Sequence, residues 1–167
     1  KFHNGQDVTP EDVIWSYQRC GNPDSADIIQ VAAFADAEIY QEGENTVCFR
    51  LSEPSNEFIS YLTTAVLPKD YTEQDTAPVG AGPFKFVSRT AQDSVVLERF
   101  DDYWGEKPSL SKVTYKIIEN ADSVVMSLQS GAVDLFAHLT ATQVAQLGEG
   151  FHVEEGTMNL VQALYLN

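Results

Sequence analysis

A glycine pair near the middle of the chain is the first feature whose residue types could do chemistry. Gly80, Ala81 and Gly82 have the Gly-x-Gly spacing found in loops that bind phosphate. Such a loop needs free backbone amides that open a helix, and Pro83 removes one of them at once. The pair instead predicts a turn in which Gly80 and Gly82 adopt backbone angles barred to other residues, and Pro83 fixes the entry into a strand.

The residues that could bind a metal or transfer protons do not form a recognisable centre either. Adjacent acids at Asp101–Asp102 and Glu154–Glu155 could suggest acid–base chemistry. However, 25 acidic residues produce such pairs by chance, and neighbours on a strand point to opposite faces. The histidines are scattered, and we interpret each as a structural or surface residue: His3, His138 and His152.

The two cysteines, Cys20 and Cys48, have no metal or redox spacing. The sequence does not decide whether they pair, because a disulfide requires their Cα atoms to lie within about 7 Å. Two unpaired buried thiols are the interpretation that we favour.

Composition places the chain among folded, acidic modules. It has 167 residues, of which 43% are hydrophobic and 11% aromatic, which suits one domain or two small lobes with a real core. The 25 acids against 10 bases give a net charge of −15, which would repel a phosphate backbone and excludes nucleic acid as a partner. No apolar run approaches the length of a membrane span. Lys1–Gly5 lack the apolar stretch of a signal peptide, and we expect the chain to be trimmed.

The elements of the first part of the chain begin with a well-marked helix. Thr9 can cap it, Pro10 suits its first position, and Glu11 and Asp12 favour its positive end, so a helix is predicted to run to about Arg19–Gly21. A turn at 22–25 follows, then a segment at 32–40 that is open between helix and strand, a strand at 46–51 and a helix at 55–63. The stretch 68–83 is interpreted as a connection.

The second part alternates between strands and helices, which is typical of an α/β sheet domain. Asp122 is predicted to cap one helix and Gly131 to end it. The remaining predictions are a hairpin of strands 84–87 and 94–100, strands at 112–118, 133–136, 151–155 and 159–166, and a helix at 140–147 that ends at Gly148.

Four segments, in this order, resemble the bacterial extracellular solute-binding proteins of family 5, the oligopeptide- and dipeptide-binding subunits of ABC importers. Each resembles one motif of that family: Lys1–Gly5 with Thr9–Ser16 (F-H-D-G … T-A-E-D-V-x-[WFY]-S), Pro78–Phe86 (P-[VI]-G-T-G-P-[YF]-x-[FL]), Leu97–Pro108 (L-x-R-N-x-D-Y-W-G-x-x-P) and Leu128–Leu135 (L-x-x-G-E-[VI]-D). Asn4, Ala81 and Phe100 depart from these patterns.

The resemblance implies an α/β fold of the type II periplasmic-binding-protein kind, of which this chain would be a central slice. Residues 1–76 would form most of the small second domain. Residues 77–167 would form the returning part of the first domain and end at the crossover to an absent third domain.

The resemblance also implies which residues support the scaffold and which contact the solute. Structural roles are expected for the motif residues: Gly80, Gly82, Pro83, Tyr103, Trp104, Gly105, Gly131 and Asp134. Asp134 is expected to bond nearby backbone amides. Ser25 and Asp27 are the candidates for solute contact, with a capping turn as the alternative, and Asn167 is the candidate next to a hinge.

As a function, the resemblance implies non-catalytic binding of peptides by clamshell closure and delivery to ABC transporter permease subunits, without a cofactor. The protein would work outside the cytoplasmic membrane, in the periplasm or tethered by a lipid. The open alternatives are a family member that carries nickel, a metal chelate, haem or an oligosaccharide, a hydrolase that uses paired carboxylates, and a free-standing interaction module.

Overall fold

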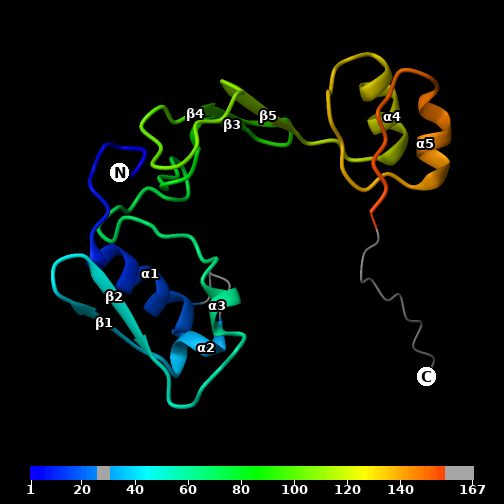
Figure 1. Ribbon diagram of the computed structural model, residues 1–167. Helices are drawn as coiled ribbons and strands as arrows, with labels where there is room; N and C mark the ends of the chain where they lie inside the picture. Colours follow the sequence, from blue (N-terminus) through cyan, green and yellow to red (C-terminus); the bar gives the residue numbers. More distant parts are fainter. Residues whose placement is uncertain (26–30, 157–167) are drawn as a thin grey trace. The chain divides into compact units, whose positions relative to one another are not determined.

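The computed structural model describes residues 1–25 and 31–156, and the chain divides into two compact units, Lys1–Tyr115 and Lys116–Asn167 (Figure 1). Each unit has its own cluster of buried apolar side chains. The boundary predicted near residue 76 lies inside the first unit, and the assignment of 1–76 and 77–167 to two family domains stays a prediction.

Helix α1 (Pro10–Gly21) begins and ends as predicted. Thr9 and Asp12 form a reciprocal capping box: the Thr9 hydroxyl accepts from the Asp12 N–H, and the Asp12 carboxylate accepts from the Thr9 N–H. Gly21 is required at the far end, because a Cβ atom there would lie 2.7 Å from the backbone of Phe34 and Ala35. The short helix α2 (Ala32–Ala35) therefore packs directly against the end of α1.

The segment that the sequence left open contains both a helix and a strand, because α2 is followed by strand β1 (Glu38–Glu42). This strand pairs with β2 (Thr46–Arg50) in an antiparallel hairpin, in which Tyr40 lies opposite Cys48. The hairpin closes the core of this region, where the Tyr17 ring stands edge-on to Phe34 and Phe49 at centroid distances of 5.0 and 5.1 Å. The helix predicted at 55–63 forms only over α3 (Phe58–Tyr61).

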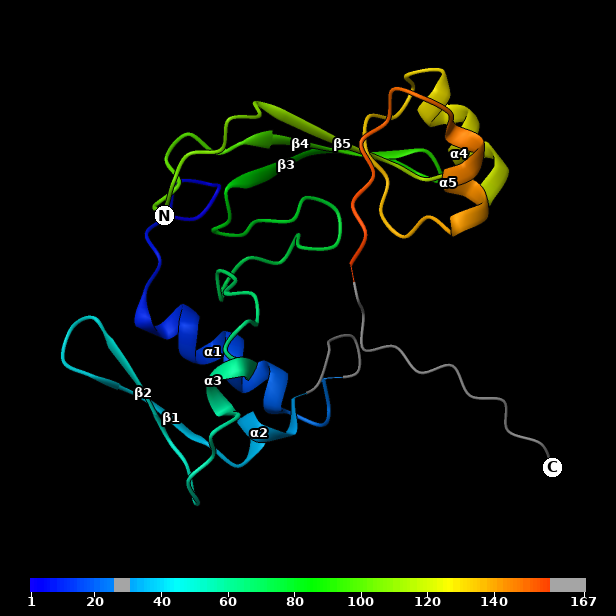
Figure 2. The same ribbon diagram turned by 45° about the vertical axis from the view of Figure 1, so that its right-hand side comes forward.

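A three-stranded sheet forms the rest of the first unit, in the order β3 (Phe84–Thr90), β4 (Ser94–Arg99) and β5 (Lys112–Lys116) (Figure 2). β3 and β4 are antiparallel, with a register shift between Phe86 and Ser88. This confirms the hairpin that the alternation of residues predicts.

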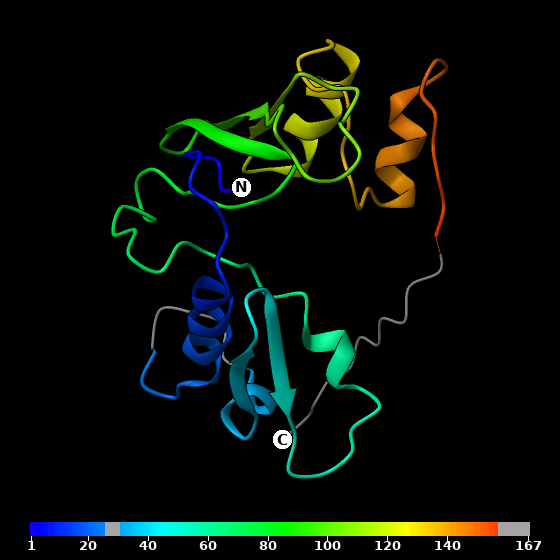
Figure 3. The same cartoon turned by 60° about the vertical axis from the view of Figure 1, so that its left-hand side comes forward.

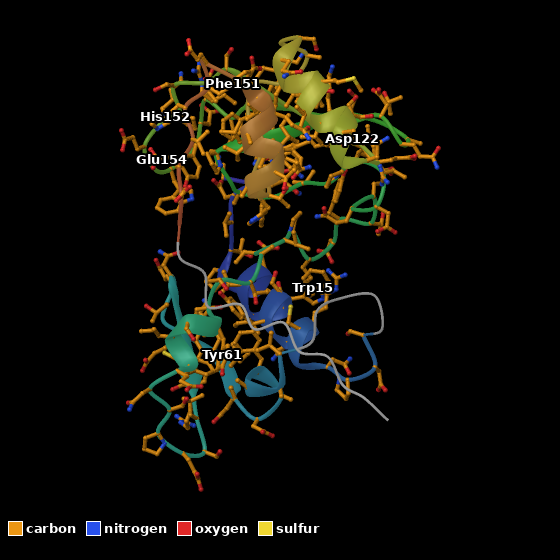
Figure 4. The ribbon with its side chains drawn as sticks, turned by 90° about the vertical axis from the view of Figure 1, so that its right-hand side faces the viewer. Trp15, Tyr61, Asp122, Phe151, His152 and Glu154 are labelled. Atoms are coloured by element: carbon orange, nitrogen blue, oxygen red, sulfur yellow. The ribbon has the colours of Figure 1, made fainter. Side chains whose placement is uncertain are left out.

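The second unit contains helices α4 (Ala121–Gln129) and α5 (Ala141–Leu147). Val124, Val125 and Leu128 pack against Leu147 in its core. Asn120, not Asp122, caps α4, because its carboxamide oxygen accepts from the Ser123 N–H at 2.8 Å. Asp122 instead lies in the first turn, where Figure 4 labels it. The helix predicted at 140–147 and its stop at Gly148 are confirmed, and Thr140 is its N-cap.

Two predicted strands of this unit are wrong: residues 133–136 and 151–155 have no strand structure. The strand predicted at 159–166 lies outside the described residues. No helix in the part of the chain that the structure describes combines the length and apolar character needed to cross a bilayer.

Candidate functional site

The motif segments of the first unit meet where two stretches of chain run between the α1 region and the sheet (Figure 3). One stretch is the N-terminal segment that leads into α1, and the other returns from α3 to β3. We call their meeting point the motif junction, defined by residues 2–5, 12–16, 67–69 and 79–83. It is the place where sequence motifs far apart along the chain contact one another.

His3 makes three hydrogen bonds across the junction. Its backbone N–H donates to the Gly80 carbonyl at 2.8 Å, its Nδ1 lies 3.2 Å from the Gly80 amide, and its Nε2 lies 3.0 Å from the Gly82 carbonyl. The imidazole also stands edge-on to Phe100, with ring centroids 5.1 Å apart. One side chain thus connects the first, second and third motifs.

The turn that presents His3 is fixed by its neighbours. Phe2 is 1% exposed, and its backbone exchanges hydrogen bonds with Gln6 and Gly5. Gly5 has φ +88°, a conformation that residues with a Cβ rarely adopt. The buried Phe2 anchors one side of His3, and the Gly5 turn returns the chain toward α1 on the other.

Asp12 and Ser16 bind the returning stretch to α1. The Asp12 carboxylate accepts from the Lys69 N–H at 2.9 Å, and the Glu11 carboxylate pairs with the Lys69 ammonium. Ser16 is 3% exposed; its Oγ accepts from the Leu67 N–H at 2.9 Å and donates to the Asp12 carbonyl at 2.7 Å. Both residues belong to the first motif, which therefore encodes the packing of residues 67–69 as well as a helix start.

An open cavity of about 390 Å³ lies beside the junction. Its size falls within the range of small-molecule sites, but its lining is polar, whereas such sites are mostly apolar. The charged and amide side chains among its lining residues are Asn4, Gln6, Asp7, Glu11, Asp12, Lys69 and Asp70. Within residues 1–25 and 31–156, no group of three or more His, Cys, Asp or Glu side chains is arranged to hold a metal ion.

The third motif forms an aromatic loop, residues 101–108, at the end of β4. The Asp101 carboxylate receives hydrogen bonds from Arg99 at 3.0 Å and Lys107 at 2.7 Å, and these cations lower the pKa of Asp101. Gly105 lies beneath the Tyr103 ring, where a Cβ atom would come within 2.7 Å. The structural role expected for Gly105 stays a prediction, because the atoms that such a Cβ would meet belong to the outer end of one side chain. The Trp104 ring centroid lies 5.3 Å from that of Tyr103, and Trp104 is 78% exposed.

Two predictions about motif residues are wrong. Gly80 and Gly82 do not have positive φ angles, and a Cβ atom at Gly80 would meet only His3, at 3.6 Å. The Asp134 side chain is exposed and makes no hydrogen bond to a described residue, so it does not bond the amides expected. Pro83, in contrast, precedes β3 directly as predicted, and its carbonyl accepts from the Phe100 N–H at 2.9 Å.

Of the two residues predicted to contact the solute, only Ser25 belongs to the described structure. Ser25 lies in the predicted turn, where its N–H donates to the Asn22 carbonyl at 3.1 Å. Asp27 and Asn167 lie outside the described residues. Gly131 has φ +70° directly after the last turn of α4, which confirms its predicted place as the stop.

The two free thiols and the two remaining histidines form no site. Cys20 and Cys48 are unpaired and half-buried, and burial raises the pKa of each. His138 is exposed, and His152 pairs with Glu154 across 2.5 Å on the segment after α5 (Figure 4). Sequence reasoning missed the connecting roles of His3 and Ser16, although both stand inside motifs that it quoted.

Comparison with known proteins agrees with these motifs. The sequence matches "Bacterial extracellular solute-binding proteins, family 5 Middle" over residues 1–167. Oligopeptide-binding protein AppA of Bacillus subtilis (strain 168) is 31% identical over 150 residues, which cover 81% of this chain and 28% of that protein.

Two solved structures show the same fold. AgaA from A. tumefaciens R10, in complex with agropinic acid, is 34% identical with a TM-score of 0.73, covering 80% of this chain and 29% of that one. AppA from Bacillus subtilis, in complex with a nonapeptide, is 27% identical with a TM-score of 0.69 over the same shares. The chain thus spans less than a third of the length of these relatives. The predicted type II periplasmic-binding-protein fold is confirmed as a partial one, and the chain belongs to family 5 of the bacterial extracellular solute-binding proteins.

Proposed function

We propose that this chain is part of the solute-binding component of an ABC importer that carries peptides. The observation that carries the proposal is the 31% identity to AppA of Bacillus subtilis, which is named as oligopeptide-binding, together with the match to the structure of AppA in complex with a nonapeptide. The component would work outside the cytoplasmic membrane, free in the periplasm or tethered by a lipid, and would deliver its solute to permease subunits.

In this proposal the chain does no bond chemistry, and two lobes of a longer protein close on the solute. The motif junction supports this role because the side chains of Asp12, Ser16 and His3 accept hydrogen bonds from backbone amides of the same chain. They fix the scaffold that carries the cleft. Peptide contact is proposed for Ser25 and Asp27 and a hinge-adjacent place for Asn167, on the family resemblance alone.

A second solute class is favoured by one observation. The match to AgaA, which was solved with agropinic acid, has higher identity and TM-score than the match to the AppA structure. Agropinic acid is therefore the alternative cargo. Nickel, a metal chelate, haem and an oligosaccharide remain further alternatives from the family resemblance.

The hydrolase alternative finds less support in the geometry. A general acid must hold a proton near the working pH, whereas Arg99 and Lys107 keep Asp101 ionised by lowering its pKa. Its neighbour Asp102 is exposed. The carboxylate pair at 101–102 thus supports loop structure better than catalysis.

A thermal-shift screen tests the proposal. The protein that contains this chain, with any flanking sequence its gene encodes, is heated with a peptide pool, agropinic acid or nickel–histidine. A ligand at a hundred times its Kd stabilises the folded state by about 2.7 kcal/mol, which is a clear rise in melting temperature. We expect the peptide pool alone to raise it; a rise with agropinic acid or nickel–histidine and none with peptides would overturn the peptide proposal.

Residues 1–167 alone are the matched control. Part of a cleft cannot bury most of a ligand's surface, so we expect this chain by itself to show little or no shift with peptides. A shift equal to that of the longer protein would show that this third of the relatives' length suffices for binding.

A further inference from the structure

The two ring nitrogens of His3 face backbone groups of opposite kind. The Gly80 amide can only donate, so Nδ1, 3.2 Å away, must accept and carry no proton. The Gly82 carbonyl can only accept, so Nε2, 3.0 Å away, must carry the proton. The geometry therefore selects the neutral Nε2–H tautomer of His3.

The surroundings of the ring favour the same uncharged state. Phe100, beyond the end of β4, covers one edge of the half-buried imidazole. Lys85 on β3 is the cation whose charge acts on His3, and Glu98 on β4 holds that lysine by an ion pair of 2.9 Å. Among the described residues, no carboxylate accepts a hydrogen bond from the ring.

We propose that His3 is a positioning residue whose neutral imidazole holds the turn at residues 79–83 against the N-terminal segment, and that protonation releases this turn. A proton on Nδ1 would point at the Gly80 N–H, so two donors would face each other and that bond would be lost. The inference does not depend on which solute the protein carries, because every group involved belongs to this chain.

The expected pH dependence follows from the direction of the pKa shift. Burial lowers the pKa of His3 below its ordinary value of 6.5, the bond to Gly82 opposes this, and Lys85 adds to the lowering. The released state therefore binds a proton more readily than the closed state. Stabilisation of the junction is complete above pH 6.5 and is lost as the pH falls from there through the folded-state pKa.

Two NMR measurements on the ¹⁵N-labelled chain test the proposal. Long-range ¹H–¹⁵N spectra should show His3 with an unprotonated Nδ1 and a pKa below its ordinary value of 6.5. The protection factor of the Gly80 amide, which corrects for the intrinsic pH dependence of exchange, should fall by up to about tenfold per pH unit between pH 6.5 and the His3 pKa. A His3 that is protonated on Nδ1 at neutral pH, or a Gly80 protection factor that is constant with pH, would overturn the proposal.

Three variants separate the pH effect from a purely structural one. His3→Asn keeps an acceptor near the Nδ1 position but cannot titrate, so Gly80 should stay protected and lose its pH dependence. His3→Phe keeps the ring but not its nitrogens, so Gly80 should lose protection at every pH. His152→Gln replaces an exposed histidine and is the control; it should leave the pH dependence of the Gly80 protection factor unchanged. If His152→Gln removed this pH dependence and His3→Asn did not, the assignment to His3 would be contradicted.

Discussion

Replacing Ser16 by alanine isolates the bond that joins the returning stretch to α1. The hydroxyl is 3% exposed, and its loss leaves the Leu67 N–H without its acceptor at 2.9 Å. An unsatisfied, partly buried amide costs about 1–3 kcal/mol. Alanine recovers up to about 0.5 kcal/mol through its higher helix propensity. We therefore expect Ser16→Ala to lower the free energy of unfolding of the first unit by about 0.5–3 kcal/mol.

Tryptophan fluorescence during urea unfolding measures this loss, because both tryptophans, Trp15 and Trp104, lie in the first unit. Ser60→Ala is the matched control: its Oγ donates to the Glu57 carbonyl at 2.6 Å on an exposed helix, without bonding another segment. The control should change stability by less than about 0.5 kcal/mol. If Ser16→Ala were as stable as Ser60→Ala at an unchanged m-value, the Leu67 bond would not hold the junction together.

Three further perturbations probe the aromatic loop and the helix cap, each by the same urea unfolding assay. Gly105→Ala places a Cβ atom 2.7 Å from the outer end of the Tyr103 ring, which can rotate away, so it should cost less than about 0.5 kcal/mol. A loss of about 1–3 kcal/mol would mean that the ring is held in place. Trp104→Phe, at a side chain that is 78% exposed, should change the free energy of unfolding by less than about 0.5 kcal/mol, with Trp15 as the fluorescent probe. A larger loss would mean that Trp104 is packed more tightly than its exposure indicates. For Asp12, burial raises the pKa but the hydrogen bonds from Thr9 and Lys69 outweigh it, so the folded pKa lies below 3.8. The stabilisation by Asp12 is present above pH 3.8 and is lost as the pH falls through the folded pKa. Asp12→Asn should remove this part of the acid dependence. An unchanged slope of the free energy of unfolding against pH would contradict the linkage.

The sequence predicts best those helix ends and hairpins that are determined by residues close together along the chain. The Thr9 cap lies directly before α1, and the Gly148 stop lies directly after α5. The β3–β4 hairpin needs only two alternating runs and a short turn. Each of these could be predicted because no distant residue decides the outcome.

The predictions that failed depend on distant partners. A strand at residues 133–136 needs a neighbour to pair with, and residues 117–156 contain no strand. Leu135 is 82% exposed there. Asn and Asp are both favoured as helix caps, so Asn120 and Asp122 could each cap this helix. Because α4 begins at Ala121, Asn120 is the residue that precedes it and accepts from the Ser123 N–H.

The motif junction was visible in the sequence only as separate motifs. Nothing in their spacing shows that the His3 ring contacts Gly80 and Gly82, almost eighty residues away. The same holds for Ser16 and Leu67, whose bond spans 51 positions. Family resemblance placed His3, Ser16, Gly80 and Gly82 in motifs but not Leu67, and the tertiary structure shows the hydrogen bonds that connect them.

Calorimetric titration of peptides into the protein that contains this chain is the most direct test of its proposed role as a peptide carrier. We predict saturable binding of peptides that differ in sequence, with one site per protein and no hydrolysis of the peptide recovered afterwards. Heats indistinguishable from dilution for every peptide, or recovery of cleaved products, would contradict it.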